Sequence, residues 1–461
     1  MKNTPHFPPE PVAWPGWPDD EPYSEHETRV IEESDSEFSA RLRRVERQWL
    51  KIQPWLQSQG YMLRPRFRPG WVPSWYTPAR WKKSVEIDYC EDAIIHVDAG
   101  SEVTIDAFRV SDGRHVCLKC IPCRAEDSME VIITEFLSQG ERRKDPRNHS
   151  IPLLDVIRAP DHCFIVFPFC RSLLPREPHF DTIGEIFDLV EQALEGLDYL
   201  HGLRIAHRYA STLYHRLSYS GPWNNVCVRT RTQVGGVRYY LIDFGESIKF
   251  EPSDSSLIDV WSKASVHAPE TLPRNRPPYD PFKADVYSMG SVLKAFSVQD
   301  YDGYFGALFP LFEAMMVEDP NGRPTAAAAL DQFREIKCSY SRTALHRRIL
   351  YQDSDAENGT ERAIYDAWHW TKQCVFAISN LECIQGKNVD LDVSKWSAVC
   401  SSDDISPSRA IKSPLSFQFD RIRDEASQPA RHHGASMAKM EDSRERATST
   451  VFLESFPPFA A

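Results

Sequence analysis

The stretch Tyr239-Tyr240-Leu241-Ile242-Asp243-Phe244-Gly245 decides how the rest of this 461-residue chain is interpreted. Its first four residues are apolar and predict a buried strand, which ends in an acidic residue followed by a phenylalanine and a glycine. A carboxylate at the end of a strand suits a divalent metal held against phosphate oxygens, and the nearby glycine leaves the backbone free to turn. An Asp-Phe-Gly tripeptide alone is weak evidence, because short motifs recur by chance.

Three further motifs follow in order along the chain. They are Ala268-Pro269-Glu270, then Asp285-Val286-Tyr287-Ser288-Met289-Gly290, and finally Asp319-Pro320 with Arg323-Pro324-Thr325. The ordered set resembles the signature motifs of the protein kinases. The resemblance implies an α+β, bilobal protein-kinase-like fold, with a small β-rich N-lobe over residues 85–170 and a large helical C-lobe over residues 171–338.

The chain before this region is expected to contain an arm and an extension. Residues 1–37 begin with a dense run of prolines, which disfavours helix, so we expect a disordered Pro-rich arm. Residues 38–84 are expected to form an extension that packs on the N-lobe. Apolar residues at spacings of three or four predict a helix within it, from Phe38 to Trp55.

Prolines alternate with aromatic residues and arginines over Gly60–Trp75. This pattern indicates an extended segment whose Trp and Arg side chains pack on the N-lobe or, alternatively, a docking groove for a partner. Together with the N-lobe motifs, the stretch resembles an expanded fungal group of protein-kinase-domain proteins. That resemblance runs to about Phe333.

Composition limits the partners and the compartment. The formal net charge of −12 argues against nucleic acid or an anionic membrane as the main partner, since both are polyanions. No apolar run reaches the ~18 residues that a membrane helix needs. The 11 cysteines show no regular spacing, so we expect a reducing, intracellular location, either cytoplasmic or nuclear.

Two predicted strands precede the candidate nucleotide site. Val103–Val110 alternates between apolar and polar residues, and Val116–Ile121 carries a single lysine, Lys119. The resemblance implies that Lys119 binds the α- and β-phosphates of ATP and that Glu130, on the next helix, holds it in place; Glu135 is the alternative partner. Without the resemblance, Lys119 would be interpreted as an exposed strand lysine.

Kinases also close over the phosphates with a glycine-rich hairpin, and that hairpin is missing here. Only Gly100 lies in the region before the strand predicted over Val103–Val110, so we expect weak ATP binding. Cys117, Cys120 and Cys123 have a spacing that could suggest a metal site. Alternation along a strand places the first two on opposite faces, which argues against that site.

The connection to the helical lobe is predicted from two further strands, Asn148–Val156 and Cys163–Cys170. The resemblance implies that Phe167 guards the back of the nucleotide pocket and that the backbone N–H of Cys170 faces adenine. A Thr-x-x-Glu capping box predicts that a helix begins at Thr182 and ends at Gly202.

The catalytic loop departs from the kinase pattern. Kinases have His-Arg-Asp, in which the aspartate accepts the substrate hydroxyl proton, but this chain has His207-Arg208-Tyr209. A phenol with a pKa of about 10 is protonated at neutral pH and cannot accept that proton. The resemblance assigns the second metal ligand, beside Asp243, to Asn225, with Asn224 as the alternative.

Sixteen residues separate Arg208 from Asn225, which is a longer connection than the kinase pattern has. The extra residues and the missing aspartate occur at the same point of the chain, which suggests a single event. That event is either genuine divergence or an error of the gene model, such as a retained intron. His215 lies within this connection and is a conceivable base, although loop histidines are usually just solvated.

The remaining C-lobe motifs are expected to be structural. Residues 246–267 have the length of an activation segment, and phosphate on one of its serines could pair with Arg208. Glu270 is expected to form a bidentate ion pair with Arg323, and Asp285 to accept hydrogen bonds from the catalytic-loop backbone.

Beyond the C-lobe we expect an extension over residues 339–400 and a disordered tail over residues 401–461. The extension contains one amphipathic helix near residues 361–378, and its apolar stripe is predicted to cap the parent domain. The stripe consists of Ile364, Trp368, Val375 and Ile378.

Three functions follow from this interpretation. The first is an ATP-binding protein-kinase-domain protein of the Ser/Thr kinase lineage that is catalytically impaired and uses Mg²⁺. The second is an active protein Ser/Thr kinase whose catalytic loop is misrepresented. The third is an interaction scaffold that ignores nucleotide. The sequence does not identify the protein substrate or partner.

Overall fold

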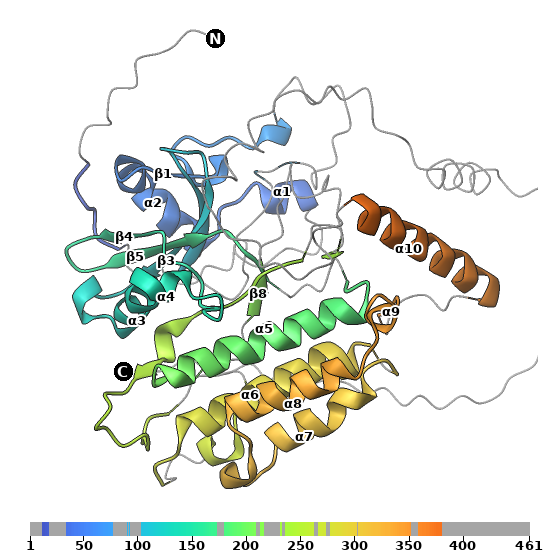
Figure 1. Ribbon diagram of the computed structural model, residues 1–461. Helices are drawn as coiled ribbons and strands as arrows, with labels where there is room; N and C mark the ends of the chain where they lie inside the picture. Colours follow the sequence, from blue (N-terminus) through green and yellow to red (C-terminus); the bar gives the residue numbers. More distant parts are fainter. Residues whose placement is uncertain are drawn as a thin grey trace, which may run out of the picture. The chain divides into compact units, whose positions relative to one another are not determined.

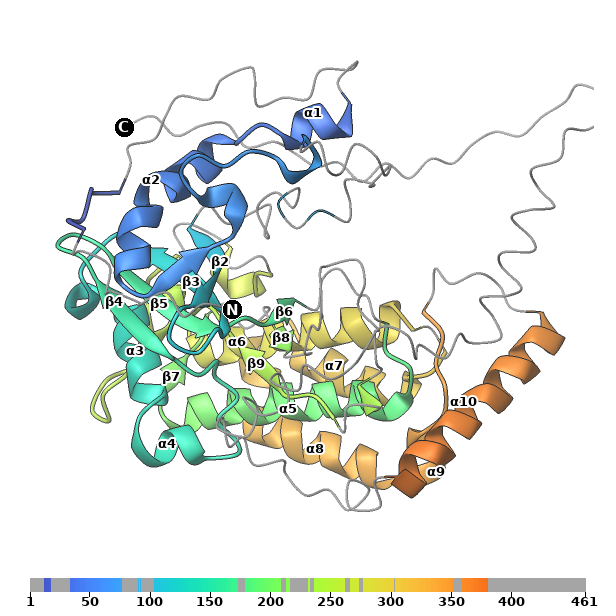
Figure 2. The same cartoon turned by 90° about the horizontal axis from the view of Figure 1, so that it is seen from above.

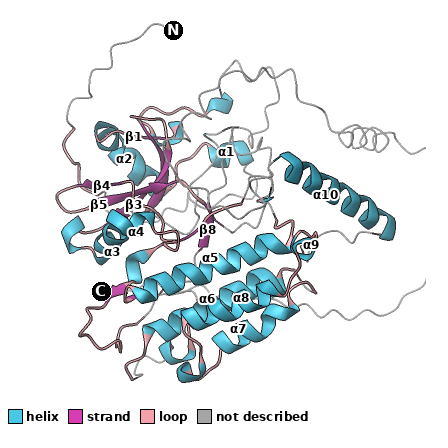
Figure 3. Cartoon of the chain, viewed as in Figure 1, coloured by secondary structure: helices cyan, strands magenta, loops and turns pink. Residues whose placement is uncertain are grey.

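The structure is a computed structural model that describes residues 12–17, 34–76, 90, 92, 103–172, 179–208, 213–215, 231–232, 236–261, 266–272, 277–301, 303–351 and 358–379 (Figure 1). These residues all belong to one unit, Met1–Asn388. Strands and helices alternate unevenly along it, so the structure is of the mixed α+β class (Figure 3).

A five-stranded antiparallel sheet has the strand order β1-β2-β3-β5-β4. Its strands are β1 (Tyr61–Leu63), β2 (Thr104–Arg109), β3 (His115–Ile121), β4 (Asp155–Arg158) and β5 (Cys163–Pro168). The predicted β2, β3 and β5 are therefore confirmed. The strand predicted over residues 148–156 is wrong in its bounds, because Ser150 forms a bridge with Leu241 outside this sheet and β4 begins only at Asp155.

Helix α2 (Arg44–Ser58) covers one face of the sheet, where Trp49, Ile52 and Leu56 pack with strand residues such as Phe164 (Figures 1 and 2). The single helix predicted over residues 38–55 is interrupted, because a short α1 (Asp35–Ser39) ends before α2 begins. The Arg66 guanidinium fills the break by donating to the carbonyls of Ser39 and Arg41. Within Gly60–Trp75, β1 pairs with β2 and the side chains of Arg64 and Arg66 are buried, whereas the alternative of a docking groove stays a prediction.

The opposite face of the sheet packs against α3 (Met129–Leu137), through Val131, and against Tyr240. A short α4 (Gly140–Lys144) follows α3. Strand alternation explains the division: Leu118 and Cys120 of β3 point toward α2, whereas Lys119 and Ile121 point toward α3.

The helical part of the structure has its own apolar core around α5 (Ile183–Gly202). The other helices of this core are α6 (Pro281–Lys294), α7 (Phe309–Met315) and α8 (Ala326–Cys338), and α8 runs beside α5 in both views (Figures 1 and 2). A π-helical turn, Ala295–Gln299, continues α6.

The predicted N-terminus of α5 is correct, but only half of its capping box forms. The Thr182 hydroxyl accepts from the backbone N–H of Glu185. The Glu185 carboxylate accepts from the N–H of Asp181 rather than that of Thr182, and its other oxygen accepts from Thr232. Contacts with a distant segment therefore replaced the local reciprocal bond.

Short strands form two further small sheets. Strand β7 (Ile205–Ala206) pairs with β10 (Ile248–Lys249), and a three-stranded sheet has the order β6-β8-β9. Its members are β6 (Arg171–Ser172), β8 (Leu213–His215) and β9 (Tyr239–Leu241).

The C-terminal helix of the described residues, α10 (Gly359–Ser379), follows a short α9 (Arg342–Leu345). The predicted helix is confirmed, but the face it buries is not the predicted one. Ile364, Trp368 and Val375 are 61%, 55% and 59% exposed, whereas His369 and Gln373 are buried. The side chain of Ile378 lies outside the described residues. In the described part of the chain, none of the helices is both long and apolar enough to span a bilayer.

Candidate functional site

Three charged side chains from separate elements meet in one cluster. Lys119 of β3 donates to Glu130 Oε1 at 2.7 Å and Oε2 at 3.0 Å, and to Asp243 Oδ1 at 2.8 Å. The predicted contact between Lys119 and Glu130 is therefore present. The alternative partner, Glu135, instead accepts from Arg158 at 3.1 Å.

Local sequence explains how each member of this cluster is positioned. Ser128 caps α3 by accepting from the N–H of Val131, which places Glu130 in the first helical turn. Asp243 follows β9 with φ +66°, a backbone conformation that non-glycine residues rarely adopt. Gly245 approaches the cluster so closely that a Cβ would lie 3.2 Å from both Asp243 Oδ1 and Glu130 Oε2.

Burial and the ion pairs act in opposite directions on the pKa values of this cluster, and for Glu130 burial outweighs Lys119 and raises the pKa. Burial alone would lower the pKa of Lys119, but Glu130 and Asp243 outweigh it and raise that pKa above its ordinary value. Burial alone would raise the pKa of Asp243, but Lys119 outweighs it and lowers that pKa. The side chain of Asp243 is 42% exposed and, among the described residues, only Oδ1 has a partner. Its second oxygen is available to a ligand.

The loop that begins at His207 is held from α6, as predicted for Asp285. The Asp285 carboxylate accepts from the backbone N–H of His207 at 2.7 Å and of Arg208 at 2.6 Å. It also contacts His201 Nε2 at 3.1 Å. His207 is buried with its ring 4.8 Å from that of Phe244, and burial lowers its pKa.

Arg208 binds main-chain atoms of the segment after Gly245. Its guanidinium donates to the carbonyls of Glu246 at 2.9 Å, Trp261 at 2.6 Å and Val260 at 3.2 Å. The segment is thus attached to Arg208 through its own backbone, and the predicted pairing of Arg208 with a phosphoserine stays a prediction. Tyr209, Asn224 and Asn225 lie outside the described residues, and His215 is described only as part of β8.

The predicted bidentate ion pair is also present. Arg323 donates to Glu270 Oε1 at 2.6 Å and Oε2 at 2.8 Å, and its side chain is fully buried. At the end of β5, Phe167 is buried and Cys170 is half-buried. The N–H of Phe169 donates to the carbonyl of His115 at 3.3 Å.

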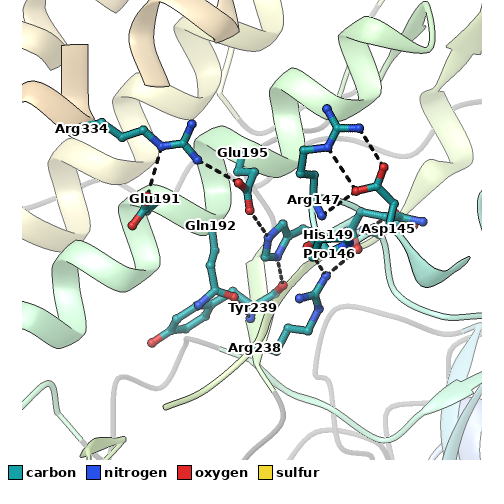
Figure 4. Close-up of polar contacts among 12 residues, drawn as sticks. Asp145, Pro146, Arg147, His149, Glu191, Gln192, Glu195, Arg238, Tyr239 and Arg334 are labelled. Carbon is teal, nitrogen blue, oxygen red and sulfur yellow. Dashed lines mark hydrogen bonds and ion pairs between the residues drawn. The ribbon is translucent and has the colours of Figure 1, made fainter. Parts of the chain in front are cut away.

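Sequence analysis missed a polar network that braces β9, the strand leading to Asp243 (Figure 4). His149 bridges the carbonyl of Tyr239, 3.1 Å from Nδ1, and Glu195 of α5, 3.2 Å from Nε2. Gln192 accepts from the N–H of Tyr239, and Arg334 of α8 binds Glu195 at 2.9 Å. These partners are far apart in sequence, so no local pattern could have indicated the network.

A second missed feature lies on the face of the sheet that carries Lys119. Asp106 of β2 is buried and accepts from Arg64 Nε at 2.9 Å. The His115 ring contacts Asp106 at 3.1 Å and is stacked between Phe108 and Phe169, with centroid distances of 4.7 and 4.1 Å. The arginines within Gly60–Trp75 were the only sequence signal for this feature, but Asp106, the acidic partner of Arg64, is 42 residues further along the chain.

The cluster can hold a phosphorylated ligand through the Lys119 ammonium and a cation through Asp243. Within the described ranges, no group of three or more His, Cys, Asp or Glu side chains is arranged to hold a metal. The described cysteines, including Cys117, Cys120 and Cys123, are not in disulfides. The chain matches no known family model, and no curated protein matches it.

Proposed function

We propose that this chain is an ATP-binding protein-kinase-like protein of the Ser/Thr kinase lineage whose phosphotransferase activity is impaired. The observation that carries the proposal is the contact of Lys119 with both Glu130 and Asp243. Lys119 lies on a strand and Glu130 on a helix, and Asp243 is 124 residues beyond Lys119 in the sequence. All three meet within hydrogen-bond distance. Kinases use these three residue types on ATP and its metal.

Three further features support the bilobal kinase-like fold. The five-stranded sheet agrees with the β-rich N-lobe that the resemblance implies, and so do the hydrogen bonds of Asp285 to the loop at His207 and the Glu270–Arg323 pair with its C-lobe motifs. Separate apolar cores in the sheet part and the helical part agree with two lobes.

The charges of the cluster fit Mg²⁺-ATP. Lys119 would bind phosphate oxygens, with Glu130 fixing its ammonium, and Asp243 would offer its second oxygen to Mg²⁺. Bound there, Mg²⁺-ATP supplies a transferable phosphoryl group. Asn225 would be the second ligand of the metal.

The proposed loss of phosphotransferase activity rests on Tyr209, which occupies the position of the proton-accepting aspartate of kinases. A phenol at its ordinary pKa of about 10 keeps its own proton at neutral pH, so it does not deprotonate a substrate hydroxyl. The second candidate, an active kinase, requires an aspartate after His207-Arg208 in the mature transcript. Sequencing that transcript across residues 207–225 decides between these two.

The main test is a thermal shift of the full-length chain with Mg²⁺-ATP. A ligand that binds only the native state at about 100 times its Kd stabilises it by about 2.7 kcal/mol. We expect a saturable rise in Tm that Lys119→Met abolishes. The matched control is Lys144→Met, because Lys144 is exposed on α4 and outside the cluster.

A folded protein with no response to Mg²⁺-ATP would contradict nucleotide binding and would support the third candidate, a scaffold that ignores nucleotide. Equal responses from wild type and Lys119→Met would place the nucleotide elsewhere. Incorporation of phosphate into a generic protein substrate would contradict the impaired state.

A further inference from the structure

A groove of about 560 Å³ lies between the segment that follows α9 and the N-terminal half of α10. This volume is within the range of small-molecule sites, about 300–1,000 Å³. The groove lies in the helical part, whereas Lys119 lies on the five-stranded sheet, so the two sites share no residue.

The charges that line this groove are unbalanced. Three arginines, Arg347, Arg348 and Arg362, face one acidic residue, Asp366. Asp366 pairs with Arg348 at 3.0 Å. Within the described part of the chain, the guanidinium groups of Arg347 and Arg362 have no hydrogen-bonded or ion-paired acceptor. Two positive charges are therefore left for a ligand.

The backbone of Arg347 is fixed by two hydrogen bonds, and its side chain is exposed at the groove. Its backbone N–H donates to the carbonyl of Ala344, and its own carbonyl accepts from the N–H of Ile183, both at 3.1 Å. Its guanidinium lies 5.7 Å from the centre of the Tyr304 ring. The backbone that carries this guanidinium therefore needs no rearrangement when a ligand binds.

The rest of the groove has an apolar character. Tyr304 and Trp370 contribute aromatic rings to the lining, and Trp370 is 37% exposed. A free inorganic anion would use the arginines and leave these rings in contact with water. An anion attached to an apolar or aromatic group would use both.

We propose that this groove binds a phosphate monoester carried on an apolar or aromatic group. Guanidinium groups bind phosphate oxygens in pairs of parallel, charge-assisted hydrogen bonds, and two such groups match the charge of a phosphate monoester. This site goes beyond the proposed function and does not depend on nucleotide binding at Lys119.

The test uses phenyl phosphate and inorganic phosphate as probes of the full-length chain, with binding measured by calorimetry at constant ionic strength. We expect saturable binding of phenyl phosphate, at least several-fold tighter than that of inorganic phosphate. The double variant Arg347→Gln/Arg362→Gln should weaken phenyl phosphate binding about tenfold or more, since it removes both charged donors to the phosphate.

Two control variants separate this groove from other cationic sites. Arg342→Gln removes an exposed arginine of α9 that does not line the groove, and it should leave binding unchanged. Lys119→Met should also leave it unchanged, so a failed nucleotide site and a failed groove give different results. The proposal is overturned if the double variant binds phenyl phosphate like wild type, if Lys119→Met abolishes binding, or if wild type does not bind it.

Discussion

Gly245 shows how narrow the space around the charged cluster is. Its position leaves no room for a side chain, because a Cβ would lie 3.2 Å from oxygens of Asp243 and Glu130. Contacts of that length require one of the carboxylates to move by a few tenths of an ångström. The residue type at this position therefore affects the geometry of Lys119 and its two partners.

Replacing Gly245 with alanine should displace Asp243 or Glu130 and lower the affinity for Mg²⁺-ATP, with a loss of about 1–2 kcal/mol of unfolding free energy from overpacking. Chemical denaturation and the Mg²⁺-ATP thermal shift measure the two effects. Gly202→Ala is the control, since a Cβ there meets nothing within 4 Å. Equal behaviour of the two variants would mean that the cluster tolerates the added methyl group.

The burial of the Glu270–Arg323 ion pair predicts a large effect on the free energy of unfolding. The Arg323 side chain is fully buried and that of Glu270 is 15% exposed, so Glu270→Gln leaves a buried guanidinium without its counter-charge. Removing one partner of a buried pair costs about 3–5 kcal/mol. Urea denaturation should show a loss near the lower end of that range.

An exposed ion pair provides the comparison. Arg334 binds Glu191 and Glu195 with 44% of its side chain exposed, and exposed pairs contribute about 0–1 kcal/mol. Arg334→Gln should therefore cost much less than Glu270→Gln. Similar costs for the two variants would contradict the structural role assigned to Glu270.

Among the elements, α10 is unusual because its buried contacts are polar. His369 Nε2 donates to the carbonyl of His346 at 2.8 Å, and Nδ1 lies 3.4 Å from the Asp181 carboxylate. Gln373 contacts His346 at 3.2 Å. An interface of this composition depends on the charge of His369 more than on apolar burial.

The docking of α10 should weaken as pH rises. Burial alone would lower the pKa of His369, but Asp181 and the His346 carbonyl outweigh it and raise that pKa above its ordinary value of 6.5. A raised folded-state pKa gives a contribution to stability that is complete below 6.5 and is lost as pH rises through the folded-state pKa.

Hydrogen exchange in α10, corrected for intrinsic rates, should therefore show more opening at pH 8 than at pH 6. Asp181, whose pKa is lowered, stays ionised across this range. His369→Gln keeps a donor for the His346 carbonyl but cannot become charged, so it should remove the pH dependence. Unchanged pH dependence in this variant would assign the effect to another group.

The two largest apolar cores among the described residues are separate. One surrounds α5 and contains Phe333, and the other lies between α2 and the sheet and contains Trp49. Both side chains are fully buried. These two cores share no residue, although Ile133 and Leu137 of α3 belong to the core around α5 and Tyr240 packs on the sheet. This arrangement favours partly independent unfolding of the two cores.

Truncating a side chain in one core should therefore destabilise that core more than it destabilises the other. Trp49→Ala and Phe333→Ala should each cost about 3–5 kcal/mol in their own core. Hydrogen exchange should show faster opening of β3 in the first variant and of α5 in the second. Equal acceleration of β3 and α5 by both variants would indicate a single cooperative unit instead.

Much of the fold and of the candidate site could be predicted from the sequence, because the signals are local. Alternation predicted β2, β3 and β5, a Thr cap predicted the start of α5, and ordered motifs predicted that Lys119 meets Glu130. The strands and the helix start were predicted from residues close in sequence, whereas the contact between Lys119 and Glu130 was predicted from the resemblance.

Only the tertiary structure decided the rest, because the deciding partners are distant in sequence. Arg66 interrupts the helix predicted over residues 38–55, and Thr232 takes part of the Glu185 capping bond. The amphipathic pattern of α10 predicted that its apolar stripe is buried, yet its docking face was determined by Asp181, His346 and Arg348. The face that a helix buries depends on the residues available to contact it elsewhere in the fold, and the periodicity of apolar residues along the helix does not include them.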